Sequence, residues 1–189
     1  MSVSKAKQLS FNDFDHLSGD LLADEIPTID KYEREYIIAI LLGPTKEPDR
    51  FIGWPPHMTV VPWFCIDNVD EAIAVLQKVS VISRAFKINI AKPDLFGPRH
   101  TVPVLRVNAI ELEQVHNILL GELENIGAEF VAPQYMGPNF NPHITIKQNM
   151  PIQSGNVIEI NKLWLIEATS YEDRRTRLKK VIAEVELQS

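Results

Sequence analysis

The chain has 189 residues, enough for one domain with a sizeable core, and its 45% hydrophobic and 23% charged residues are typical of a globular protein. The formal net charge of −6 argues against a broad basic surface that follows a nucleic-acid backbone, but it permits a local positive pocket for a small anion. The single cysteine, Cys65, excludes an internal disulfide and favours a reducing, cytoplasmic location, and no stretch approaches the roughly 20 apolar residues that cross a bilayer.

The N-terminal segment differs in composition from the rest of the chain. Its sequence FNDFDHLSGDLLADEIPTID is acidic, weakly periodic and interrupted by Gly19 and Pro27. A segment of this kind buries little apolar surface. We therefore expect residues 1–33 to form an arm or appendage and residues 34–189 to form the folded domain.

Two strands and a helix are predicted next. Residues 36–42 are a short apolar run that ends at Gly43, as expected of a buried strand. The stretch HMTVVPWF predicts a second strand, in which Pro62 indicates an edge or a bulge. Asn68 followed by Glu71 predicts a helix N-cap, and apolar residues at helical spacing extend this helix to about residue 82.

The second half of the chain repeats the mixture of strands and a helix. AFKINIA and TVPVLRVNA alternate as strands do, on either side of the turn-rich KPDLFGPRH. Apolar residues from Leu112 to Ile126 predict an amphipathic helix that ends at Gly127, with His116 outside its apolar stripe and hence in solvent. HITIKQ, VIEINKLWLIEA and LKKVIAEVEL predict the remaining strands.

The last two predicted strands flank a charged turn that carries the main basic cluster of the chain. We expect this cluster to be a solvated hairpin tip, with contact to an RNA backbone as the alternative; its residues are Arg174, Arg175, Arg177, Lys179 and Lys180.

The order of these elements predicts an α+β fold. Antiparallel sheets with helices on one face are the economical way to pack them. We expect a bilobal, pseudo-two-fold arrangement of two antiparallel sheets with covering helices and a central cleft.

One short pattern occurs in both halves of the chain. PHMTV places His57 and Thr59 behind a proline, and PHITI does the same with His143 and Thr145. Residues two apart on a strand point to the same face, so each pair projects together. If the halves pack about a two-fold axis, the pairs meet across the cleft.

Two imidazoles and two hydroxyls suit a phosphodiester substrate. One neutral imidazole can take a proton from water or an alcohol while an imidazolium protonates the departing alkoxide. The hydroxyls of Thr59 and Thr145 can donate to the non-bridging oxygens, where negative charge gathers. A single such motif is weak, but the doubled and context-matched pair is specific.

The doubled pattern resembles the signature of the 2H phosphoesterase superfamily, and its layout is nearest to the 2′-5′ RNA ligase and cyclic phosphodiesterase branch. The resemblance spans about residues 35–189 and implies metal-independent, cofactor-free chemistry on 2′,3′-cyclic phosphates or 2′-5′ linkages. It assigns the catalytic roles to His57, Thr59, His143 and Thr145. It also implies a nucleotide or a short RNA end as the substrate, and we expect a monomer.

The resemblance also suggests residues that bind the substrate. Many relatives hold phosphate with an arginine five residues after the second histidine; Gln148 stands there in this chain, and Lys147, on the face of His143 by alternation, is the expected substitute. Phe96 and Arg99 fall in a loop that relatives place at the cleft edge, where they would contact a base and a phosphate.

Three further aromatic residues are candidates for the walls of a nucleotide pocket. Trp63 shares the strand parity of His57 and is either a stacking platform or a core residue. Tyr135 and Phe140 lie in the proline- and glycine-rich APQYMGPNFNP that precedes the second motif.

Two other functions are compatible with the same residues. A 2H-like domain could bind a nucleotide without turning it over, and the altered phosphate position at Gln148 is the feature that favours this alternative. The same pair of histidines could also join RNA ends, because one acid–base pair serves both directions. A metal hydrolase is disfavoured, because two histidines without convergent carboxylates leave a metal short of ligands.

Overall fold

The computed structural model describes residues 32–43, 49–97, 99–148, 150–169 and 176–189. Except for its last two residues, the predicted N-terminal arm lies outside the described residues, as do Arg174 and Arg175 of the predicted basic turn. The division into an arm and a domain therefore stays a prediction.

The described elements follow the predicted order of strands and helices. They are β1 (Arg34–Leu41), β2 (Arg50–Phe51), β3 (His57–Cys65), α1 (Val69–Ile82), β4 (Phe86–Phe96), β5 (Val102–Asn108), α2 (Ile110–Asn125), β6 (Glu129–Phe130), η3 (Pro133–Tyr135), η4 (Gly137–Asn139), β7 (His143–Thr145), β8 (Val157–Ile160), β9 (Lys162–Thr169) and β10 (Lys179–Glu186). Added to the prediction are β2, β6 and the two 3₁₀ turns. Two predictions are wrong: the stretch VIEINKLWLIEA forms two strands, of which β8 pairs with β4 and β9 with β1, and β4 continues through the predicted turn as far as Phe96.

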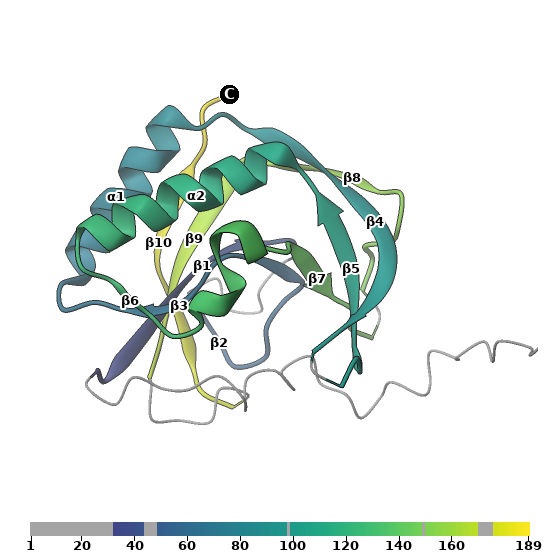
Figure 1. The fold of residues 1–189 in the computed structure, drawn as a ribbon, viewed down its shortest axis with the longest axis horizontal. Coiled ribbons are helices and arrows are strands. Elements are labelled where there is room, and N and C mark those ends of the chain that lie inside the picture. The colour runs from purple at the N-terminus through teal and green to yellow at the C-terminus, as the bar shows by residue number, and fades with distance from the viewer. Residues whose placement is uncertain (1–31, 44–48, 98, 149, 170–175) are drawn as a thin grey trace, which may run out of the picture.

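The strands pair antiparallel throughout the sheet, in the order β2-β10-β9-β1-β3-β7-β5-β4-β8, with β6 added beside β3. The left side of Figure 1 holds β10, β9, β1 and β3, and the right side holds β7, β5, β4 and β8. The predicted α+β fold with antiparallel sheets is confirmed. Its two halves are joined into one sheet, since β3 and β7 pair through Met58 and Ile144.

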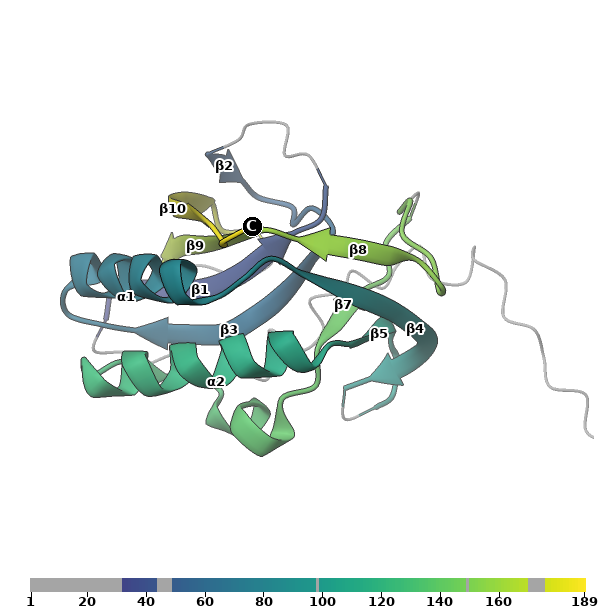
Figure 2. The same ribbon diagram turned by 90° about the horizontal axis from the view of Figure 1, so that it is seen from above.

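Both helices lie side by side on one face of the sheet (Figures 1 and 2). Asn68 caps α1 as predicted, because its Oδ1 accepts a hydrogen bond from the amide of Asp70 at 3.1 Å. Gly127 follows the end of α2 with a positive φ of 81°, which lets its amide bond to the carbonyl of Glu124 at 3.0 Å. The sequence signals therefore locate both helix ends correctly.

The main core lies between these helices and the sheet. Leu76 of α1 and Leu119 of α2 are fully buried against strand residues such as Met58 and Ile144. The opposite face carries a second, smaller apolar cluster, which includes Ala39 and residues of β3 and β9. The sheet is thus apolar on both faces, but helices cover only one of them.

A bulge interrupts β3 at the predicted place. The pairing with β1 is irregular at two points: between the pairs Tyr36–Phe64 and Ile38–Val61, a step that contains Pro62, and between Ile38–Val61 and Ala39–Thr59, where Val60 is passed over. Proline cannot donate to a strand ladder, which explains the first of these irregularities.

No helix within the described parts of the chain is long and apolar enough to cross a membrane.

Candidate functional site

Strand alternation places the two motifs on the face that the helices leave open. Met58 and Ile144, the central residues of the motifs, are fully buried in the core beneath the helices. Their strand neighbours must then point to the opposite face. The structure accordingly brings four half-buried side chains to that face: His57, Thr59, His143 and Thr145.

The pairing of β3 with β7 fixes how the two motifs approach each other. Met58 lies opposite Ile144 on an antiparallel strand. Continuing that register sets His57 opposite Thr145 and Thr59 opposite His143. The two histidines are therefore diagonal neighbours, for which the typical separation of backbone positions is about 7–8 Å. Side chains at diagonal positions of this kind are close enough for one small group to contact both.

Each motif histidine is oriented by a backbone carbonyl two residues before it. Nδ1 of His57 lies 3.0 Å from the carbonyl oxygen of Pro55, and Nδ1 of His143 lies 2.9 Å from that of Asn141. A carbonyl can only accept, so Nδ1 carries the hydrogen in both rings. The lone pair of each neutral ring is consequently on Nε2.

An aromatic ring packs against each of these imidazoles. Trp54 stacks on His57 with ring centroids 4.1 Å apart and an angle of 21° between the planes. Phe96 lies against His143 at 4.8 Å and 57°. Phe96 was predicted from the sequence, whereas Trp54 was missed. Its signal is its position three residues before the motif histidine, the place that Phe140 holds in the second motif.

Burial and nearby positive charges keep His57 neutral. Removal from water lowers the pKa of His57 to about 3, against the opposing effect of its bond to the Pro55 carbonyl. The positive charges of Lys147, His143 and Lys179 are smaller contributions to the same lowering of the pKa. The presence of His143 among these charges indicates that the two motif histidines lie near each other.

The second histidine has fewer charged neighbours. Burial lowers the pKa of His143, and its bond to the carbonyl of Asn141 opposes this effect. Arg106 of β5 lies directly opposite His143 in the strand register. Its guanidinium lies 5.4 Å from the centre of the Phe96 ring and donates from Nε to Asp94 at 2.7 Å. Sequence reasoning missed Arg106, because its position depends on the pairing of β5 with β7.

Lys147 reaches from the second motif toward the first. Its ammonium donates to the carbonyl of Trp54 at 2.7 Å, so it fixes the loop whose tryptophan stacks on His57. Gln148, which occupies the position of the arginine found in many relatives, is exposed. Lys147 therefore brings positive charge to the site, as the sequence suggested, and also links the two half-sites.

The other sequence candidates lie in three different settings. Arg99 is exposed in the turn after β4, and Tyr135 is 47% exposed in η3. Trp63 is on the face of the motifs, but the guanidinium of Arg177 lies 4.2 Å from the centre of its ring and Trp54 packs at its edge. The ring contact of Phe140 is with His116 of α2, at 3.8 Å and nearly parallel.

Two expectations about exposure are wrong. His116 is fully buried, because both of its ring nitrogens have hydrogen-bond partners. Arg177 and Lys179 are also buried, not part of a solvated hairpin tip. Arg177 donates to the buried carboxylate of Glu35 at 2.9 Å, and Lys179 donates to the carbonyl of Ile52 at 2.9 Å. A buried charged side chain needs a partner to offset its loss of hydration. The partners of Arg177 and Lys179 are distant in the chain, so the local sequence does not reveal them.

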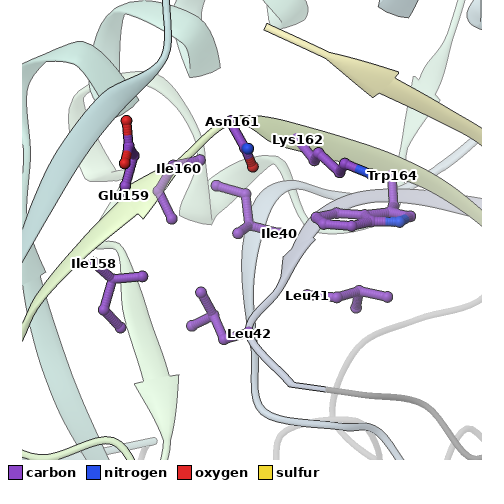
Figure 3. Close-up of a pocket in the computed structure, with 9 residues that line it drawn as sticks. All are labelled: Ile40, Leu41, Leu42, Ile158, Glu159, Ile160, Asn161, Lys162 and Trp164. Carbon is purple, nitrogen blue, oxygen red and sulfur yellow. The ribbon is translucent and has the colours of Figure 1, made fainter.

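Within the described segments, no group of three or more histidine, cysteine or acidic side chains could hold a metal ion. A cavity of about 210 Å³ opens on the seam between β1 and β8–β9 (Figure 3). Its lining is mostly apolar and includes Leu41 and Trp164, but none of the four motif residues. We therefore place the site at the paired motifs and not in this cavity.

Comparisons with known proteins agree with the fold. The sequence model of the 2′-5′ RNA ligase superfamily matches residues 24–162. Among solved structures, one described as a phosphoesterase has a TM-score of 0.57 at 14% identity, covering 84% of this chain and 100% of its own. A protein from Thermus thermophilus gives a TM-score of 0.57 at 15% identity, covering 82% of this chain and 98% of its own.

Escherichia coli LigT has also been solved with phosphate, and that structure gives a TM-score of 0.54 at 16% identity, covering 84% of this chain and 100% of its own. At these identities the likeness shows the fold alone. None of the curated proteins matches this chain in sequence.

Proposed function

Because this chain belongs to the 2′-5′ RNA ligase superfamily, in which 2H phosphoesterase activity is general, we propose that it is a metal-independent phosphoric diester hydrolase. Its substrate is a 2′,3′-cyclic phosphate or a 2′-5′ linkage in a nucleotide or at an RNA end. The observation that carries the proposal is the pairing of β3 with β7, which puts both histidine–threonine motifs side by side on one face.

We assign the general base to His57 and the general acid to His143. The cations around His57 oppose its protonation, so its Nε2 lone pair is available to take a proton from the attacking water. An anionic substrate between the rings raises the pKa of His143 and lets it hold a proton. As the water oxygen bonds to phosphorus, the bond from phosphorus to the sugar oxygen breaks and His143 protonates that oxygen.

The remaining groups bind and stabilise the phosphate. Thr59 and Thr145 donate from their hydroxyls to the non-bridging oxygens, and Lys147 supplies positive charge from the end of the second motif. That LigT was solved with phosphate and with 3′-AMP supports an anionic nucleotide as the ligand of this fold.

Phe96 and Arg106 extend the site along β4 and β5. We propose that the exposed part of the Phe96 ring contacts the base and that Arg106, held by Asp94, meets a phosphate oxygen. Arg99 and Tyr135 stay candidates at the rim. Trp63 packs against Trp54 and supports it, and Phe140 holds the loop before the second motif against His116 of α2.

Turnover assays with 2′,3′-cyclic nucleotides, 2′-5′ dinucleotides and RNA ending in a cyclic phosphate test this function. We expect turnover that survives EDTA, with losses of about 10²- to 10⁴-fold for His57→Ala and for His143→Ala. Thr59→Ala and Thr145→Ala should cost less. Calorimetric binding of a nucleoside monophosphate without turnover of any of these diesters would instead favour the binding module.

A further inference from the structure

His116 is a buried histidine that the chemistry above does not use. It lies on α2, beneath the sheet and on the opposite side from the motif face, and it is fully buried. Both ring nitrogens are bonded. Nδ1 lies 2.6 Å from the carbonyl oxygen of Val60, and Nε2 accepts from the amide of Gly137 at 3.0 Å. The ring is therefore neutral, with its hydrogen on Nδ1.

The first partner of His116 is attached to the first motif. Val60 follows Thr59 directly and is the residue that the β1–β3 register passes over. A bulged residue lacks the regular ladder that holds its neighbours. The hydrogen bond from His116 holds the backbone of β3 at Val60. It therefore helps to set the direction in which the neighbouring Thr59 side chain projects.

The second partner segment leads into the second motif. Gly137 begins η4, and Phe140, the residue directly after η4, stacks on the His116 ring with centroids 3.8 Å apart and planes 6° from parallel. Only two residues separate Phe140 from His143. One of them, Pro142, has a fixed φ, and its carbonyl accepts from the amide of Val107 at 3.0 Å. The segment from Phe140 to His143 is therefore short and restrained, with the His116 stack at one end and β5 holding Pro142 near the other.

We propose that His116 is a positioning residue, which sets the distance between the two half-sites by holding both motif-bearing segments with one ring. Its importance comes from the short junction between β3 and β7, whose strand pairing is through Met58 and Ile144. That His116 positions a catalytic site rests on the function proposed above. The two hydrogen bonds of His116 and its stack on Phe140 are independent of that function.

Three substitutions separate the contacts of His116. His116→Phe keeps a ring against Phe140 but removes both hydrogen bonds. His116→Asn keeps a donor near the position of Nδ1 for Val60, and His116→Gln keeps an acceptor near the position of Nε2 for Gly137. Leu119→Ala, at a fully buried position one turn along α2, removes core volume without removing a side-chain hydrogen bond and controls for lost stability.

The steady-state experiment uses a 2′,3′-cyclic nucleotide. We expect His116→Phe to lower kcat by about 10- to 100-fold with a smaller change in KM, because misplaced acid and base groups weaken the transition state more than binding. Asn and Gln should each recover part of kcat. Leu119→Ala, compared at an equal margin below its melting temperature, should keep kcat within about twofold of the wild type. Equal losses in the Phe and Leu119 variants would overturn the proposal.

Imidazole ¹⁵N NMR of the full chain gives a readout that needs no turnover. In the wild type, we expect His57 and His143 to show the Nδ1–H tautomer. In His116→Phe, we expect both to shift or to exchange between tautomers. The Asn variant should preserve the His57 signal better, and the Gln variant the His143 signal. Unchanged signals of both histidines in a folded Phe variant would refute the positioning role. Absence of wild-type turnover would refute only the proposed function.

Discussion

At the residue scale, the site differs between its two halves mainly in charge. Both motif histidines donate Nδ1–H to a carbonyl two residues back, yet the pKa of His57 is also lowered by Lys147 and Lys179. These two lysines also hold the loop before the motif, through the carbonyls of Trp54 and Ile52. The same side chains therefore place His57 and keep it unprotonated.

Replacing Lys147 with methionine should shift the pH dependence of turnover. Loss of the positive charge raises the pKa of His57, so the base becomes protonated at a higher pH and the acidic limb of kcat/KM moves upward. A pH–rate profile of the free enzyme measures this limb. Lys180→Met, at an exposed position of β10, is the matched control and should leave the limb in place. A limb that stays in place or moves to lower pH in Lys147→Met would contradict the assignment of His57 as the base.

Glu35 and Arg177 are fully buried partners from distant parts of the chain. Glu35→Ala should lower the free energy of unfolding by about 3–5 kcal/mol, because it removes the carboxylate from a buried guanidinium. Equilibrium denaturation with urea measures the loss. The double variant Glu35→Leu, Arg177→Met should lose less unfolding free energy than the sum of the losses in the single variants Glu35→Leu and Arg177→Met. Additive losses would show that the two side chains do not depend on each other.

At the element scale, most helices and strands and their apolar faces follow from local signals, but the burial of single polar residues does not. The N-cap at Asn68 and the glycine at 127 mark helix ends that the structure reproduces. The apolar pattern of α2 placed His116 in solvent, since no local pattern reveals that a strand carbonyl and a loop amide will meet its ring. Arg106 escaped notice for the same reason, because its place beside His143 depends on strand pairing.

The cap of α1 should matter for stability and not for chemistry. Asn68→Ala removes the acceptor for the amide of Asp70 and should cost about 1 kcal/mol of unfolding free energy. For a chain of this size, that corresponds to a fall in melting temperature of roughly 2–4 °C. Asn68→Asp should retain most of the stability, and kcat should stay at the wild-type value in both. A clear fall in kcat in either variant, measured well below its melting temperature, would link α1 to the site.

At the scale of the whole molecule, the sequence predicted the two halves and their shared motif, and it could not predict how they join. The doubled histidine–threonine pattern selected the four residues that we propose for the site, and the pairing of β3 with β7 brings their strands together. The junction through Met58 and Ile144, and the contact of Lys147 with the loop of the other half, are long-range features. Such contacts depend on register between segments far apart in the chain, which a local pattern does not contain.

The stability of the whole chain should depend on pH through three histidines. The pKa values of His57, His116 and His143 are all lowered in the folded state. The unfolded chain therefore binds protons more readily, and stability should fall as pH drops below about 6.5 and continue to fall toward the folded pKa values. Melting temperatures between pH 7.5 and pH 5 measure this slope. It should be shallower in His57→Gln, and an unchanged slope would show that His57 is not held neutral.

The antiparallel approach of β3 and β7 has a consequence for how a polymer is read. If the substrate is an RNA end, as proposed, two like half-sites that run in opposite directions do not distinguish 5′ from 3′, so the motif residues alone would accept the strand in either orientation. Lys147 and Lys179 break this equivalence by gathering around one imidazole. Under the proposed function, we therefore expect the lysines, and not the motifs that they accompany, to set the orientation in which a strand binds.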